Sequence, residues 1–246
     1  MQKMLRQKIV LAGVALALLA RLASSEEGTA PLRVAATTTL VGDVVKQVGG
    51  DSVNVHVLLP PGCDPHAFEP TPRDMVMLDK ASIIFINGVG LERFIDPLLQ
   101  NCPTLRVVSV SEGVPLLMLD PHAESEHAHE HYDQGGADPH VWFDPKNVVA
   151  WVKNIKTALC EACPSRADYF DIQAQRYIEN LLELDRWIET EVNTLEPSER
   201  LLISDHDELG YFAERYGFHK LGSIIPSFST MAEPSARQIA DLYKVI

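Results

Sequence analysis

The sequence alternates short runs of apolar and β-branched residues with helical patterns, and this alternation restricts the fold more than any other feature. Four runs bounded by Gly, Pro or polar residues are predicted strands, at 33–36, 53–59, 83–86 and 106–110. Helices are predicted between them, at 40–48, 72–80 and 92–100. Strands separated by helices form parallel sheets, because a parallel crossover needs a dozen or more residues. We therefore expect an α/β protein whose first lobe is a parallel sheet flanked by helices.

One helical pattern is much longer than the others. Between Ser165 and Glu196, apolar residues recur every three, four or seven positions, and acidic residues cover the other face. At ~1.5 Å per residue this helix would exceed about 40 Å, which favours a rigid link between two lobes. A second series follows, with strands predicted at 201–204 and 221–225 and helices at 208–216 and 235–246.

The second series contains only two parallel strands, which are too few for a sheet with its own core. We therefore expect the second lobe to be incomplete and the full-length protein to continue beyond Ile246. The predicted organisation is a leader, a first metal-binding lobe, a linking helix and a partial second lobe. Their ranges are 1–25, 26–164, 165–196 and 197–246.

The first 25 residues have the pattern of a signal peptide. They contain four basic residues and no acidic one, then an apolar run at 9–20 and the small residues Ala23, Ser24 and Ser25. The apolar run is shorter than the ~20 residues that span a bilayer as a helix, although a retained membrane anchor is the alternative. No Cys lies near the expected cleavage point, so we predict an exported, cleaved, periplasmic protein without a lipid anchor.

The charge of the chain argues against nucleic acid as a partner. The 246 residues include 21 Lys and Arg and 34 Asp and Glu, a net charge of −13, whereas binding phosphates needs a cationic surface. Export would place the four cysteines in an oxidising compartment, where their three possible pairings stay open. Cys160 and Cys163 form a C-x-x-C without the context of a thioredoxin motif. Cys63 and Cys102 have no assignable partner.

The most informative motif occurs twice. The segments 64–70 and 138–145 both read Asp-Pro-His, then an aromatic residue, then an acidic residue followed by Pro. Proline fixes its own φ and restricts the residue before it, so each turn should hold its histidine rigidly. A neutral imidazole with a carboxylate nearby is a typical metal ligand, so His66 and His140 are candidate metal ligands. Two histidines that merely occupy Pro-rich turns are the alternative.

Further histidines fall into three classes. His206 follows a predicted strand, where open α/β sheets place their ligand sites, and is the third candidate ligand. His56 and His219 lie singly in strand-like contexts and are expected to be structural. The acidic loop 122–136 carries four more, which we predict to be an accessory metal-collecting segment, a solvated spacer being the alternative. These are His122, His127, His129 and His131.

Taken in chain order, the motifs resemble the zinc/manganese solute-binding proteins of bacterial ABC importers. The matching segments are 60–74, 87–92, 138–145, 206–212 and 233–235. The resemblance implies two α/β lobes joined by a long rigid helix, with a divalent metal ion held between them. It places the first three ligands on His66, His140 and His206, and the fourth, an Asp, beyond Ile246. Cys63 departs from the family, which commonly has a small residue there.

The resemblance also implies a function. Such a protein, acting as a monomer, captures Zn²⁺ outside the cytoplasmic membrane and delivers it to a permease powered by an ATPase. Manganese-preferring members usually have a carboxylate at the third position, so His206 favours zinc over the alternative, Mn²⁺. A zinc hydrolase is a second class, with Asp64 or Glu69 as base, but the sequence has no H-E-x-x-H. A surface adhesin is a third class that no repeat or stalk supports.

Overall fold

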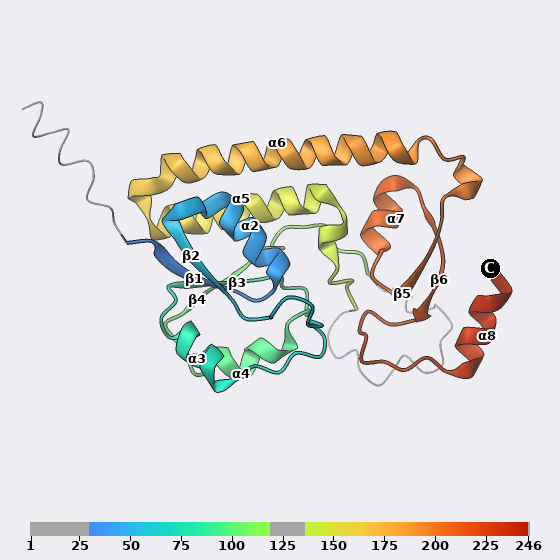
Figure 1. The fold of residues 1–246 in the computed structure, drawn as a ribbon, viewed down its shortest axis with the longest axis horizontal. Coiled ribbons are helices and arrows are strands. Elements are labelled where there is room, and N and C mark those ends of the chain that lie inside the picture. Colours follow the sequence, from blue (N-terminus) through green and yellow to red (C-terminus); the bar gives the residue numbers. More distant parts are fainter. Residues whose placement is uncertain (1–29, 119–135, 246) are drawn as a thin grey trace, which may run out of the picture. The chain divides into compact units, whose positions relative to one another are not determined.

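The computed structural model describes residues 30–118 and 136–245. The predicted signal peptide and the four histidines His122, His127, His129 and His131 lie outside the described residues. Residues Leu32–Ile246 form a compact unit, to which all elements below belong (Figure 1). Within the described part of the chain, no helix is both long and apolar enough to cross a membrane.

The first sheet has four parallel strands in the order β2-β1-β3-β4. The strands are β1 (Leu32–Ala36), β2 (Val53–Val57), β3 (Ile83–Ile86) and β4 (Arg106–Ser109). The predicted sheet is therefore confirmed, and the 83–86 strand has the predicted ends. Because β1 pairs with β2 on one side and β3 on the other, the chain reverses its winding direction at β1. Ligands bind at the carboxyl ends of strands beside such a point.

Helices cover both faces of this sheet. The larger core cluster packs α2, α5 and the long helix α6 on one face, and a smaller cluster packs α3 and α4 on the other. In α2, Val41, Val44, Val45 and Val48 are buried at helical spacing. The helices are α2 (Thr39–Gly49), α3 (Pro72–Leu78), α4 (Asp96–Leu99) and α5 (Pro145–Ala162). Single 3₁₀ turns lie at η1 (Gly50–Ser52), η2 (Arg93–Ile95), η4 (Val141–Phe143), η5 (Pro164–Arg166) and η6 (Pro197–Glu199).

Two expectations for the first lobe need correction. The single helix predicted at 92–100 is instead a 3₁₀ turn followed by the short helix α4, because Pro97 has no N–H to donate and fits only the first turn of a helix. Helix α5 was not among the predicted elements. Its buried residues Val148, Trp151, Val152 and Ile155 nevertheless have helical spacing, so periodicity could have found it.

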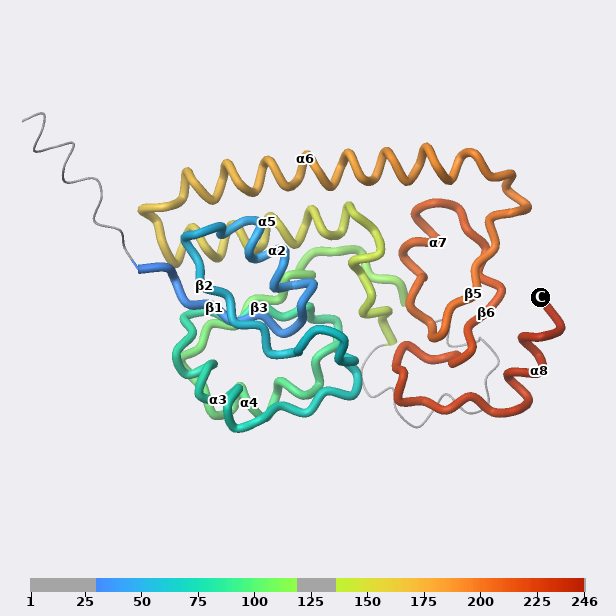
Figure 2. The backbone as a smooth tube through the Cα atoms, viewed as in Figure 1, coloured from blue at the N-terminus to red at the C-terminus, as the bar shows by residue number. Residues whose placement is uncertain are grey.

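The long helix α6 (Ala167–Val192) has 26 residues, or about 39 Å at 1.5 Å per residue. Figure 2 shows that it runs alongside α5 and continues past it to the second sheet. Phe170 and Ala174, near the start of α6, are buried in the core of the first lobe. Asp185, towards its other end, accepts hydrogen bonds from Arg215 and Tyr216, which follow the first strand of the second sheet in the sequence. The predicted long helix is confirmed, and it is also a layer of the first core.

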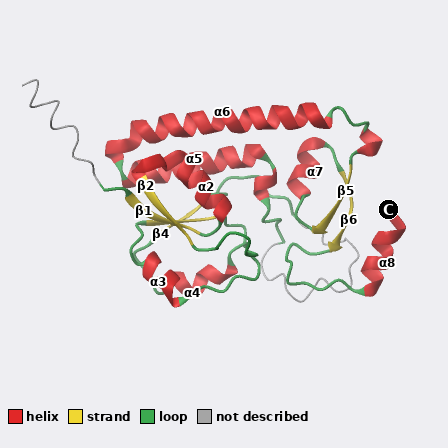
Figure 3. Ribbon diagram, in the orientation of Figure 1, coloured by secondary structure: helices red, strands yellow, loops and turns green. Residues whose placement is uncertain are grey.

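The second sheet contains two parallel strands, β5 (Leu201–His206) and β6 (His219–Ile225) (Figure 3). Helix α7 (Gly210–Tyr216) connects them, and α8 (Ala236–Val245) follows. The register shifts between Leu202, which pairs with Lys220, and Ile203, which pairs with Gly222, so Leu221 is an extra residue in β6. Strand β5 ends two residues later than predicted, and its last residue is His206. The predicted lobe ranges 26–164, 165–196 and 197–246 stay predictions.

Candidate metal centre

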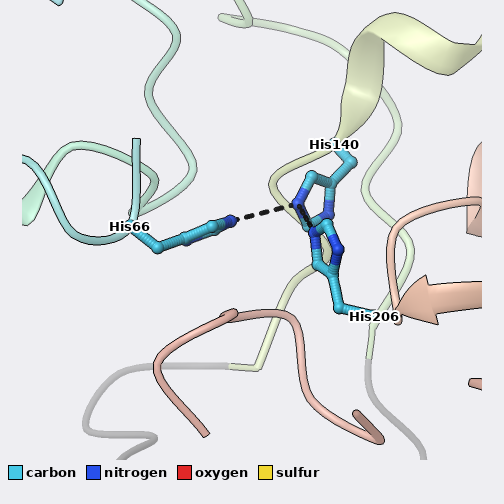
Figure 4. A group of neighbouring side chains, drawn as sticks. All are labelled: His66, His140 and His206. Carbon is cyan, nitrogen blue, oxygen red and sulfur yellow. Dashed lines mark hydrogen bonds between the residues drawn. The ribbon is translucent and has the colours of Figure 1, made fainter. Parts of the chain in front are cut away.

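Three imidazoles meet at the carboxyl ends of the strands of both sheets. His66 lies in the loop after β2, His140 precedes α5, and His206 is the last residue of β5. Nε2 of His140 lies 3.3 Å from Nε2 of His66 and 3.3 Å from Nε2 of His206 (Figure 4). His140 and His206 are buried and His66 is half-buried. The structure therefore brings together all three histidines that the sequence proposes as ligands.

Both Asp-Pro-His motifs form the same local turn. Asp64 Oδ1 accepts the His66 backbone N–H at 2.8 Å, and Asp138 Oδ1 accepts the His140 N–H at 2.9 Å. Such side-chain bonds two residues along the chain are a usual way for Asp to fix a turn. A helix starts after each turn, at Pro72, as predicted, and at Pro145.

Carboxylates also orient two of the rings. Asp138 Oδ1 lies 2.8 Å from His140 Nδ1, and Asp205 Oδ1 lies 3.0 Å from His206 Nδ1. A carboxylate at Nδ1 favours the tautomer that carries the proton there, which leaves Nε2 with a free lone pair. The Nε2 lone pairs of His140 and His206 then face each other at 3.3 Å, an arrangement that a cation between them would stabilise.

The nitrogen spacing fits a tetrahedral metal ion. Zn–N bonds of about 2.0–2.1 Å place two ligand nitrogens about 3.3–3.4 Å apart. This matches both measured Nε2–Nε2 distances of 3.3 Å. The described residues thus offer a preformed set of three nitrogen donors.

The surroundings keep the centre apolar on one side. The Trp142 ring packs edge-on against His140 at 5.3 Å between centroids, and Phe228 lies at 6.3 Å. The aromatic residue of the first motif behaves differently, because Phe68 packs on Phe94.

Burial, and next the charge of His140, lowers the pKa of His66 to about 4. The His66 imidazole is therefore neutral near pH 7, the form that coordinates a metal.

The comparisons with known proteins agree with this geometry. The family model described as "Zinc-uptake complex component A periplasmic" (ZnuA) matches residues 34–246. The chain belongs to the ZnuA family. This is a family of solute-binding proteins and not of enzymes, so the expectation that the chain is no enzyme is confirmed.

Individual relatives of this ZnuA-family chain differ in the metal they are named for. It is 32% identical over 199 residues to the manganese-binding lipoprotein MntA of Halalkalibacterium halodurans, covering 81% of this chain and 62% of the relative. It is 32% identical over 210 residues to the zinc-binding protein TroA of Treponema pallidum, covering 85% and 64%. The chain thus spans a little over three fifths of the length of these relatives.

Solved structures support the fold. The structure of the periplasmic zinc-binding protein TroA from Treponema pallidum superimposes with a TM-score of 0.74 at 30% identity, covering 87% of this chain and 73% of that one. The α/β architecture with a long helix is therefore the TroA-like fold.

Sequence reasoning missed the residues that support the His140 turn from the first sheet. The Asn87 amide donates to the Pro139 carbonyl at 3.1 Å and so holds the turn from β3. Asn87 is itself fixed by the buried Glu92, whose carboxylate accepts the backbone N–H groups of Asn87 at 2.5 Å and Gly88 at 3.0 Å and the Thr37 hydroxyl at 2.6 Å. Burial raises the pKa of Glu92. The 87–92 segment belonged to the resemblance, but its supporting role had no local signal.

Helix α7 supports the same turn from the second sheet. The buried Tyr211 hydroxyl donates to the Asp138 carbonyl at 3.0 Å and accepts the Leu117 N–H at 3.1 Å. A Cβ at Gly210 would lie 2.6 Å from Asp138 Oδ2, so only glycine allows this close approach. Arg215 anchors the other end of α7 on the carboxylate of Asp185 at 3.0 and 2.5 Å. These contacts connect residues far apart in the sequence and could not be predicted from it.

The remaining sequence candidates lie outside this cluster. Cys63 is exposed, and all four cysteines are free thiols in this structure. His219 is exposed on β6, and His56 Nε2 is buried without a hydrogen-bond partner among the described residues. The accessory role of the 122–136 loop stays a prediction.

Proposed function

We propose that this ZnuA-family chain captures a divalent metal ion outside the cytoplasmic membrane and delivers it to an ABC-type importer. Zn²⁺ would be the substrate, and His66, His140 and His206 would be its ligands. The observation that supports this most strongly is the convergence of three Nε2 atoms at 3.3 Å spacing around His140. The family membership supports the transport role.

The donor set favours zinc over manganese. Imidazole nitrogen suits Zn²⁺, whereas Mn²⁺ prefers carboxylate and water oxygen. The three converging donors are all nitrogen atoms, and their spacing matches tetrahedral Zn–N geometry. Manganese is the alternative substrate, because relatives with similar identity are named for either metal.

The surrounding residues would assist capture without any covalent chemistry. Asp138 and Asp205 hold the Nδ1 protons of His140 and His206, so both Nε2 atoms can bind the ion without first losing a proton. His66, with its lowered pKa, is also neutral near pH 7. The net charge of −13 should favour the approach of a divalent cation at low salt. The partners would be a membrane permease and its ATPase, and the chain would act as an exported monomer.

A metal titration tests the ligand assignment. Zn²⁺ affinity is measured by competition with a chromophoric chelator for wild type, His66→Ala and His140→Ala. The exposed His219 supplies a matched control, because His219→Ala also removes one imidazole. We expect both ligand variants to lose affinity and the control to bind as wild type does. Wild-type affinity in His66→Ala and His140→Ala would show that the assignment is wrong.

The same assay separates the two metals. Wild-type protein is titrated with Zn²⁺ and with Mn²⁺ under identical conditions, and native mass spectrometry reports the stoichiometry. A single Zn²⁺ held much more tightly than Mn²⁺ is expected from three imidazole donors. Tighter binding of Mn²⁺ would favour the alternative substrate.

A further inference from the structure

The carboxylates around the three histidines are of two kinds. Asp64, Asp138 and Asp205 each precede a histidine and accept its backbone N–H, at 2.8, 2.9 and 2.7 Å. Glu208 instead follows His206 by two residues, and its Oε2 lies 3.7 Å from His206 Nε2. The three aspartates therefore shape the turns, whereas Glu208 faces the nitrogen that points into the centre.

The partner of His206 Nδ1 limits what Glu208 can do. Asp205 Oδ1 lies 3.0 Å from this nitrogen and takes its proton as a hydrogen bond. His206 Nε2 then carries a lone pair and has no proton to donate to Glu208. A lone pair and a carboxylate oxygen repel each other unless a proton or a metal cation lies between them. A metal ion at the three nitrogens would supply that cation.

We propose that Glu208 adds a carboxylate oxygen to the three imidazoles when the metal ion binds. This rests on the proposed function and deepens it, since it names a ligand within the described chain in addition to the three histidines. An oxygen and a nitrogen on one tetrahedral Zn²⁺ are about 3.4 Å apart, close to the 3.7 Å between Glu208 Oε2 and His206 Nε2. The Glu208 side chain is 25% exposed, so it has room to turn towards the ion.

The oxygen donor has a consequence for selectivity. Mn²⁺ prefers oxygen ligands more strongly than Zn²⁺ does. Removing the Glu208 carboxylate should therefore weaken Mn²⁺ binding by a larger factor than Zn²⁺ binding. A role limited to folding would affect both metals equally.

Asp207 supplies the matched control. It is adjacent to Glu208 in the sequence, but its carboxylate accepts a hydrogen bond from Lys220 Nζ and forms an ion pair with it. Asp207→Asn changes the net charge by the same amount as Glu208→Gln. It does so without touching the group that faces His206 Nε2.

The experiment titrates Glu208→Gln, Glu208→Asp and Asp207→Asn with Zn²⁺ alone and Mn²⁺ alone, by chelator competition, and records the visible absorption of bound Co²⁺. We expect Glu208→Gln to lose about 10–100-fold in Mn²⁺ affinity, the range found when a residue that supports a metal site is removed. It should lose less affinity for Zn²⁺, and the absorption spectrum of its bound Co²⁺ should change. Glu208→Asp, which keeps a carboxylate, should recover part of the Mn²⁺ affinity. Asp207→Asn should match wild type in all three measurements.

The outcomes separate this inference from the proposed function. Wild-type affinities and an unchanged Co²⁺ spectrum in Glu208→Gln would overturn the role of Glu208. If His140→Ala abolishes binding in the same assay, the three-histidine site stands and only the assignment of Glu208 as a ligand is wrong. If His140→Ala binds as wild type does, the proposed function itself fails. Equal losses for both metals in Glu208→Gln, with an unchanged Co²⁺ spectrum, would also contradict a ligand role.

Discussion

The two Asp-Pro-His turns share a sequence but not an environment. The first turn is half-buried, and its aspartate accepts only the His66 backbone N–H and the Thr230 hydroxyl among the described hydrogen bonds. The second turn is buried, with His140 1% exposed and Asp138 bonded both to the His140 backbone and to its ring. The motif itself is thus sufficient for the turn, and burial decides how firmly the imidazole is held.

The second turn also has more hydrogen-bonded support from the surrounding elements than the first. The second turn is held by Asn87 from the first sheet and by Tyr211 from the helix that follows His206. The 18-residue helix α5 starts directly after it, whereas the seven-residue α3 follows the first turn. We infer that His140 is the fixed ligand of the centre and His66 the adaptable one.

The largest difference is expected between Asp138→Asn and Asp64→Asn. Asp138→Asn removes the charge that holds His140 Nδ1–H and should lower Zn²⁺ affinity by about 10–100-fold, the usual cost of losing a ligand's orienting partner. Asp64→Asn should cost less than about tenfold, because Asp64 bonds the His66 backbone rather than its ring. Chelator competition measures both. Equal losses would refute the contrast between a fixed and an adaptable ligand.

Tyr211→Phe tests the support of the second turn from helix α7. The change removes one hydroxyl and leaves the buried Leu117 N–H and the Asp138 carbonyl without their partner. The free energy of unfolding should fall by about 1–3 kcal/mol, the cost of unsatisfied buried polar groups. Urea denaturation measures it, with Tyr243→Phe as control because Tyr243 is 81% exposed. A Tyr211→Phe protein as stable as the control would show that this bridge is dispensable.

Thr230→Val makes the corresponding change at the first turn. It removes the hydroxyl that donates to Asp64 and keeps the shape of the side chain. Because both residues are half-buried and water can replace the bond, the loss of stability should be about 0.5–1.5 kcal/mol. The same urea measurement applies. A loss greater than that of Tyr211→Phe would reverse the proposed order of the two turns.

A further difference is expected in the acid range. The folded pKa of His66 is lowered to about 4, mainly by burial, whereas an unfolded histidine titrates near the ordinary value of about 6.5. The unfolded chain therefore binds this proton first, and stability should fall as pH decreases from about 6.5 towards 4. In metal-free protein, His66→Gln should show a shallower fall over this range. An NMR titration of His66 with a midpoint near 6.5 would contradict the lowered pKa.

The sequence was informative wherever the signal was local. The 83–86 strand, the two Asp-Pro-His turns and the helix that begins at Pro72 depend on neighbouring residues, through apolar runs and through the fixed φ of proline. His206 could be proposed because strand ends are ordinary ligand positions in α/β proteins. The helix predicted at 92–100 was wrong because Pro97 fits only the first turn of a helix, so the helix can start no earlier than Asp96.

The supporting residues could not be found in this way. Thr37 and Glu92 are 55 positions apart, and Asp138 and Tyr211 are 73 apart. No local pattern distinguishes such a buried glutamate or tyrosine from one that lies on the surface. Their roles come from tertiary packing, which brings both sheets to the same centre.

The extra residue in β6 has a consequence for how this chain tolerates changes in length. Leu221 is the β6 residue without a partner in β5, so a chain without it could keep both the Leu202–Lys220 and the Ile203–Gly222 pairs. Removal of a paired residue such as Ser223 would instead move the residues that follow it to the opposite faces of the strand. Removal of Gly222 itself would bring a residue with a side chain to the position where a Cβ lies 2.9 Å from Leu242 of α8. Point substitutions on the solvent side of β6 should therefore be tolerated more readily than deletion of a single paired residue within it.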